Sequence, residues 1–164
     1  MVLTMIDASQ HLHRPWVYPP SNAAAFRAYL KRIAPASHAG FLALRRVDHA
    51  LVGVVNLNEI IRGAMSSAFL GYYASAVCAG QGLMAEGLAL VIDHAFGPLH
   101  LHRLEANIQP ANERSIALVR RCGFQQEGFS RRYLKIGGRW RDHERWAMWA
   151  ERWRELRRTG MIAF

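Results

Sequence analysis

The chain has 164 residues and a mass of 18.6 kDa, which indicates one domain, and 51% apolar against 20% charged residues excludes disordered and collagen-like proteins. No apolar run reaches the ~18 residues of a membrane-spanning helix, and no signal-peptide pattern opens the chain. The formal net charge is +9, and residues 120–158 hold twelve basic and five acidic side chains, so +7 lies there. We therefore expect a single cytoplasmic domain over residues 1–164 whose partners include phosphates, acidic surfaces or RNA.

The first half of the chain predicts one helix and three strands. Ser21 or Asn22 can cap a helix over residues 23–33, which Pro35 ends. Strands are expected at residues 40–46, 51–57 and 67–73, the first two joined as a hairpin.

The second half predicts three helices and three strands. Asn112 can cap a helix through residue 122, and Gly123 suits the left-handed position after its end. The other helices are expected at 83–96 and 151–158, and the strands at 103–108, 126–136 and 140–149. This order predicts an α+β (mixed α/β) fold with one central, mixed and twisted sheet and helices on its faces.

The sequence Ala-Gly-Gln-Gly-Leu-Met-Ala-Glu at residues 79–86 carries the most chemical information. Glycines let backbone N–H groups approach a ligand, and the helix that follows adds unpaired N–H groups and a partial positive charge. Together they favour a site for a pyrophosphate, although a plain tight turn would give the same pattern.

Two nucleotide sites fit this motif. Gly80, Gly82 and Ala85 with Glu105 resemble a dinucleotide fingerprint, which would indicate a nicotinamide-dependent oxidoreductase. Against it, the motif lies mid-chain and the preceding strand ends six residues before Gly80. The second interpretation is a coenzyme A site. A basic RNA-binding module that uses residues 120–158 stays open as a third alternative.

Several segments together resemble the GNAT N-acetyltransferases. They are the strand Phe-Leu-Gly-Tyr-Tyr at 69–73, the loop at 79–82, the strand Arg-Leu-Glu-Ala-Asn at 103–107, Pro-Ala-Asn-Glu-Arg-Ser at 110–115 and Cys-Gly-Phe at 122–124. Within that superfamily, residues 61–63, 126–128 and 133–143 resemble the ribosomal-protein N-terminal alanine acetyltransferases. The resemblance covers residues 12–149. It implies a first strand that is here missing, truncated or replaced by residues 1–7.

The resemblance also implies an activity and a cosubstrate. An acetyl group would pass directly from acetyl-CoA to a primary amine, either the N-terminal alanine of a ribosomal or other protein or a small amine such as an antibiotic or polyamine. The protein would act as a monomer or homodimer and without a metal. By family position, the acetyl-CoA contacts would be Tyr72, Tyr73 and Ala74 beside the pantetheine, Gly80, Gln81, Gly82, Leu83 and Met84 at the pyrophosphate, and Asn107 and Asn112 at the pantetheine arm.

Three residues are candidates for proton transfer. Ser115 could protonate the leaving thiolate, Glu59 could accept a proton from the amine, and Tyr133 is a second acid candidate. Val119 occupies the position at which many members of the family carry a tyrosine that acts as the general acid. We expect Cys122 and the tryptophans Trp140, Trp146, Trp149 and Trp153 to be core residues, and Asp142 and His143 to make structural hydrogen bonds.

Overall fold

The computed structural model describes residues 1–162, so the last two residues of the predicted domain lie outside the described part of the chain. A six-stranded mixed sheet has the order β1-β2-β3-β4-β6-β5. The strands are β1 (Ala39–Leu44), β2 (Leu51–Ile61), β3 (Ser67–Ala74), β4 (Arg103–Ile108), β5 (Gln125–Ile136) and β6 (Arg139–Trp149). The helices are α1 (Val2–Ala8), α2 (Gln10–His13), α3 (Ala23–Ile33), the short 3₁₀ turn η1 (Ala76–Cys78), α4 (Leu83–Phe96), α5 (Glu113–Arg121) and α6 (Ala150–Arg158).

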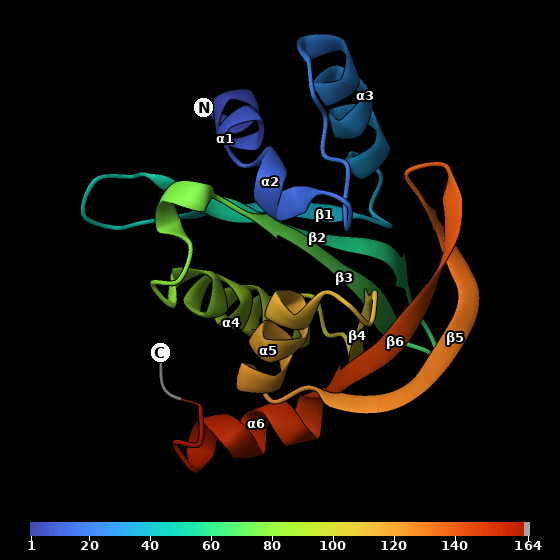
Figure 1. The fold of residues 1–164 in the computed structure, drawn as a ribbon. Helices are drawn as coiled ribbons and strands as arrows, with labels where there is room; N and C mark the ends of the chain where they lie inside the picture. The colour runs from blue at the N-terminus through green and yellow to red at the C-terminus, as the bar shows by residue number, and fades with distance from the viewer. Residues whose placement is uncertain (163–164) are drawn as a thin grey trace.

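The helices form two layers around the sheet. Helices α1, α2 and α3 lie on one side, and α4 and α5 lie on the other (Figure 1). The main core lies between the sheet and α4, where Leu57 and Leu104 meet Leu88 and Ile92 with no exposed surface. Alternate residues of the strands pack against the helices on the opposite side of the sheet, because successive side chains of a strand point to opposite faces. There Val54 packs with α1 in a smaller cluster.

Strands β3 and β4 pair in parallel at only three positions. Ser67 to Phe69 face Arg103 to Glu105, and beyond these pairs the strands part. Strand β3 stays paired with β2, whereas β4 stays paired with β6. The divergence leaves a wedge in the middle of the sheet, where backbone edges lack a neighbouring strand.

The predicted elements after residue 22 are confirmed, together with their caps. The Asn22 side chain accepts a hydrogen bond from the Ala25 N–H at 2.9 Å. Gly123 adopts φ +84°, and the Phe124 N–H donates to the Val119 carbonyl, which closes the end of α5. The fold class is therefore the mixed α/β arrangement expected from the order of the elements.

Of the three alternatives for the N-terminal segment, replacement of the first strand by residues 1–7 is excluded, since residues 2–8 form helix α1. Met5 and Ile6 are buried against the sheet, and tertiary packing of this apolar side stabilises a short helix. Side chains also bind the segment to the end of β3. Ser9 Oγ accepts from the Ala76 N–H at 2.9 Å, and His13 Nε2 lies 2.8 Å from the Ala74 carbonyl oxygen.

Two further expectations are corrected. Strand β2 continues to Ile61, so Glu59 lies inside the strand, at an irregularity where its φ is +50°. Trp140 is 61% exposed near the tip of the β5–β6 hairpin and is not a core residue, because the hairpin extends past the edge of the packed layers. Within residues 1–162, no helix is long and apolar enough to cross a membrane.

Replacing Leu88 by Ala should destabilise the protein by about 2–5 kcal/mol, because Leu88 is 0% exposed and its loss leaves a cavity under the sheet. The free energy of unfolding in urea measures this. Leu90→Ala is the matched control on the same helix, since Leu90 is 70% exposed and its truncation should cost little. Equal losses for the two variants would contradict the assigned orientation of α4.

Candidate active site

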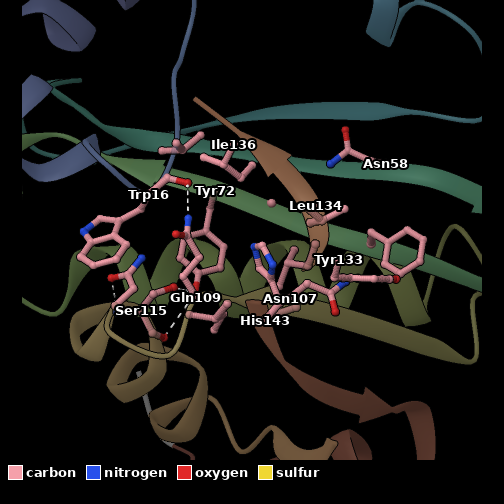
Figure 2. A pocket seen from close by; sticks show the side chains of 17 residues that line it. Trp16, Asn58, Tyr72, Asn107, Gln109, Ser115, Tyr133, Leu134, Ile136 and His143 are labelled. Atoms are coloured by element: carbon pink, nitrogen blue, oxygen red, sulfur yellow. Dashed lines mark hydrogen bonds between the residues drawn. The ribbon is translucent and has the colours of Figure 1, made fainter. Parts of the chain in front are cut away.

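The wedge between β3 and β4 opens into a pocket of about 370 Å³. It is lined by β2 and β3, by β4 and the loop after it, by the start of α5, by the β5–β6 hairpin and by the segment after α2 (Figure 2). The lining residues are Trp16, Val17, Asn58, Phe69, Leu70, Gly71, Tyr72, Ala106, Asn107, Ile108, Gln109, Asn112, Ser115, Tyr133, Leu134, Ile136 and His143. Every element around the wedge therefore contributes to one cavity.

A pair of hydroxyl groups lies at the α5 side of this pocket. Tyr72 Oη is 2.6 Å from Ser115 Oγ, and it also donates to the Ser115 carbonyl at 3.3 Å. Burial raises the pKa of the Tyr72 hydroxyl above its ordinary value, and the hydrogen bond to Ser115 opposes this rise. Both hydroxyls are therefore protonated at neutral pH and can share or pass a proton.

The helix cap positions Ser115. Asn112 Oδ1 accepts a hydrogen bond from the Ser115 N–H at 3.3 Å, which is the capping geometry expected from the sequence. Since this bond uses the backbone of Ser115, its side chain stays available for Tyr72. The predicted site residues Tyr72, Asn112 and Ser115 thus lie together.

Asn107 brings an unsatisfied polar atom to the pocket. Its Oδ1 is buried and has no hydrogen-bond partner among the described residues. Leaving such an acceptor unpaired costs about 1–3 kcal/mol, which a bound N–H or O–H group would recover. Asn107 therefore fits a ligand that carries amide donors.

The opposite wall comes from the β5–β6 hairpin and from the segment after α2. Tyr133 lines the pocket, and its ring packs edge-on against His143 with the centroids 6.2 Å apart. The Gln109 side chain donates to the Trp16 carbonyl at 3.2 Å and holds this segment across the opening (Figure 2). Neither Gln109 nor Trp16 carries a recognisable sequence pattern, and only the folded chain places them here.

The glycine loop lies outside this pocket, at the N-terminus of α4. Gly80 and Gly82 have φ of +77° and +81°, which aligns successive N–H groups toward solvent. Residues 79–81 are exposed, and among the described residues no hydrogen-bond acceptor pairs with the amides of residues 80–84. A Cβ added to Gly80 would meet nothing within 4 Å, so the space over the loop is open. These features fit an anion such as a pyrophosphate.

Other predicted site residues lie elsewhere. Tyr73 points to the opposite face of the sheet, where it packs edge-on against His13, so only its backbone borders the wedge. The Met84 side chain is part of the main core. Glu59 does not line the pocket. Its side chain is 65% exposed, and its carboxylate lies 3.6 Å from His38 Nε2.

The dinucleotide-binding interpretation of the glycine motif receives no structural support. Glu105 is bound to Arg103 within β4 at 2.9 Å, and β3 runs antiparallel to β2, unlike a dinucleotide-binding half. No group of three metal-ligating side chains occurs in the part of the chain that the structure describes. Cys122 is fully buried, and burial raises the pKa of its thiol to about 12, which leaves it a core residue rather than a nucleophile.

Several known proteins are similar to this chain in sequence or in fold. The chain is 44% identical over 97 residues to a probable N-acetyltransferase, YjcK, of Bacillus subtilis, and 39% identical over 106 residues to the ribosomal protein uS5-alanine N-acetyltransferase of Escherichia coli. These matches cover 59% and 65% of this chain but only 54% and 55% of those relatives, about half of their length.

The fold matches solved structures over nearly the whole chain. Mycobacterium smegmatis RimJ, solved in complex with CoA-disulfide, superposes with a TM-score of 0.82 at 29% identity, covering 96% of this chain and 82% of that one. The ribosomal-protein-S5-alanine acetyltransferase of Vibrio fischeri gives 0.78 at 25% identity, covering 93% and 87%. Spermidine N-acetyltransferase from Vibrio cholerae, at 22% identity and a TM-score of 0.75, shares the fold.

The sequence profile of one family settles the assignment. The profile described as the acetyltransferase (GNAT) domain matches residues 2–125, which is most of the chain and includes the glycine loop, the wedge and α5. The chain therefore belongs to the GNAT acetyltransferase family.

Proposed function

We propose that this protein is an acetyl-CoA-dependent N-acetyltransferase whose acceptor is the α-amine of a protein N-terminus that begins with alanine or a similarly small residue. A ribosomal protein is the acceptor class we favour. The observation that carries this proposal is a wedge-shaped, uncharged and mainly apolar pocket that holds several amide and hydroxyl groups, next to an open amide loop. The relatives named for ribosomal-protein alanine acetylation support the choice.

Acetyl-CoA would supply the activated acetyl thioester, and the residues present fit it at three places. The amides of residues 80–84 would bind its pyrophosphate. The edge of β3 at Tyr72, Tyr73 and Ala74 would hold the pantetheine amides by backbone hydrogen bonds. Asn107 Oδ1 would accept a hydrogen bond from an amide N–H of the cosubstrate, which would give this buried oxygen the partner that it lacks.

The charge of the pocket favours a peptide over a polyamine. Among the residues that the structure describes, its lining contains no Asp, Glu, Lys or Arg and one histidine, His143. Burial lowers the pKa of His143, so the cavity is uncharged at neutral pH. A polycationic amine would gain no counter-charge there, whereas the amides of Asn58, Asn107 and Gln109 can hydrogen-bond a peptide backbone. An α-amine has a pKa of about 7.7–8.0, so part of it is already neutral at pH 7.

The hydroxyl pair would deliver the proton that the departing sulfur needs. Ser115 Oγ is the proposed donor, and Tyr72 Oη, 2.6 Å away, would replace the proton. Tyr133, on the facing wall, is the second candidate acid. Holding amine and thioester in one pocket would supply much of the rate acceleration.

Acetyl transfer to a panel of amines tests the proposed function. We expect transfer to a peptide that begins with Ala, and at least tenfold lower kcat/KM for spermidine and for the same peptide with a blocked N-terminus. Mass spectrometry of the products measures this. Preference for spermidine would overturn the acceptor assignment. Stabilisation of the protein by NAD but not by acetyl-CoA in a thermal shift would overturn the whole proposal.

Gly80→Ala should raise the Kd for acetyl-CoA about tenfold, because a Cβ at φ +77° strains the loop and stands over the proposed pyrophosphate site. Gly138→Ala is the matched control. Its φ is +79° and its Cβ also meets nothing within 4 Å, but it lies at the hairpin turn. Calorimetric titration compares the two variants, and an equal effect on both would argue against the loop as a cosubstrate contact.

Ser115→Ala should lower kcat about 100-fold while leaving the Kd for acetyl-CoA unchanged, because it removes a proton donor but keeps the N–H that Asn112 caps. Steady-state kinetics and calorimetry separate the two quantities. Ser21→Ala, at an exposed position before α3, is the control and should match the wild type. Retention of full kcat by Ser115→Ala would remove Ser115 from the mechanism.

A further inference from the structure

One histidine in the pocket takes no part in the roles described so far. His143 lies in β6, opposite Ser130 of β5, and its side chain forms part of the pocket wall. Figure 2 shows the side chain among the other pocket residues. It is only 3% exposed. A buried histidine that lines a ligand cavity has the chemistry of a proton carrier, provided that one ring nitrogen faces the ligand.

A backbone hydrogen bond determines which nitrogen carries the proton. His143 Nδ1 lies 3.0 Å from the Arg141 carbonyl oxygen. A carbonyl oxygen only accepts hydrogen bonds, so Nδ1 holds the proton and Nε2 carries the lone pair. This contact sets both the tautomer and the orientation of the ring.

The lone pair of Nε2 is accessible from the pocket. No hydrogen bond joins Nε2 to any residue in the described chain. Nε2 is likewise not one of the fully buried, unpartnered side-chain atoms of residues 1–162, and the ring to which it belongs lines the cavity (Figure 2). Nε2 is therefore a base that a ligand can reach.

The surroundings keep this base neutral at working pH. Burial lowers the pKa of the His143 imidazole below its ordinary 6.5, while the Arg141 carbonyl and the Asp142 carboxylate partly oppose the shift. Asp142 itself accepts a hydrogen bond from the Arg132 N–H at 2.8 Å. The titratable groups on the other pocket walls are the phenols Tyr133 of β5 and Tyr72 of β3.

We propose that His143 is the general base of the transfer reaction and takes a proton from the acceptor ammonium onto Nε2. The neutral amine then forms the new C–N bond while the C–S bond of the thioester breaks. Ser115 gives its proton to the departing sulfur and regains one from Tyr72, the second proton of the amine nitrogen returns to Tyr72, and the proton on Nε2 leaves to solvent. The inference rests on the proposed function and adds a residue to it.

The alternative base fits the geometry less well. Glu59 faces solvent beside His38 and does not line the cavity, so it would need intervening water to reach the amine. Tyr133 lines the facing wall, where it is already the second candidate acid. His143 is the one pocket-lining group in residues 1–162 that is basic and neutral at pH 7.

The kinetic test uses His143→Asn, in which the amide N–H₂ can still donate to the Arg141 carbonyl while the Nε2 base is lost. The acceptor is whichever amine the wild type acetylates. We expect about a 100-fold loss of kcat/KM at pH 7 that shrinks by pH 9. The acidic limb of the pH profile should move from below 6.5 to near 8, the pKa of the amine itself. Calorimetry should give an unchanged Kd for acetyl-CoA.

His49→Asn is the matched control, because His49 lies exposed in the β1–β2 turn and asparagine tolerates its φ of +58°. It should keep the wild-type pH profile. Failure of the wild type to bind acetyl-CoA would defeat the proposed function. Transfer by the wild type with an unmoved profile in His143→Asn, or a moved profile in Glu59→Gln alone, would defeat only the assignment of His143.

A second measurement needs neither acetyl-CoA nor an acceptor. Two-bond ¹⁵N–¹H NMR of the imidazoles, with the His143 signal assigned by its loss in His143→Asn, reports the tautomer. We expect proton on Nδ1, an unprotonated Nε2 at pH 7 and a midpoint below 6.5. An Nε2–H tautomer, or a ring that stays charged at pH 7, would overturn the inference.

Discussion

The divergence of β3 and β4 is the constraint on which the rest of the structure depends. Three residue pairs hold the strands together, and each strand then follows a different neighbour. A sheet interior normally satisfies its backbone groups by pairing, so a gap there exposes donors and acceptors that a ligand must meet. The pocket, the hydroxyl pair and the unpaired Asn107 oxygen all lie around this gap.

The same contacts serve stability and chemistry. The Asn112 cap begins α5 and at the same time presents Ser115 to Tyr72. The end of β3 is held by Ser9 and His13 from the N-terminal helices, on the face away from the pocket. The backbone edge proposed to hold the pantetheine is therefore supported from behind by packed side chains, which keeps its position defined before any ligand binds.

The pocket is uncharged and mainly apolar although the chain carries a net charge of +9. The excess of arginine lies on outer surfaces, where Arg120 covers the ring of Trp146 and Arg157 that of Trp153. A positive exterior favours contact with anionic partners, whereas an uncharged, buried cavity favours the neutral form of the histidine that lines it. Charge at the surface and neutrality inside thus serve different steps of one proposed reaction.

The sequence alone determined the elements after residue 22, because caps such as Asn22 and Asn112, the left-handed Gly123 and the hydrophobic periodicity act locally. It also indicated the glycine loop and the family, since both depend on short contiguous motifs. Helix α1 escaped prediction because its stability comes from burying Met5 and Ile6 against distant strands. The tertiary structure alone decided that Glu59 faces solvent and that His143 faces the pocket, since strand irregularities and long-range packing set where those side chains point.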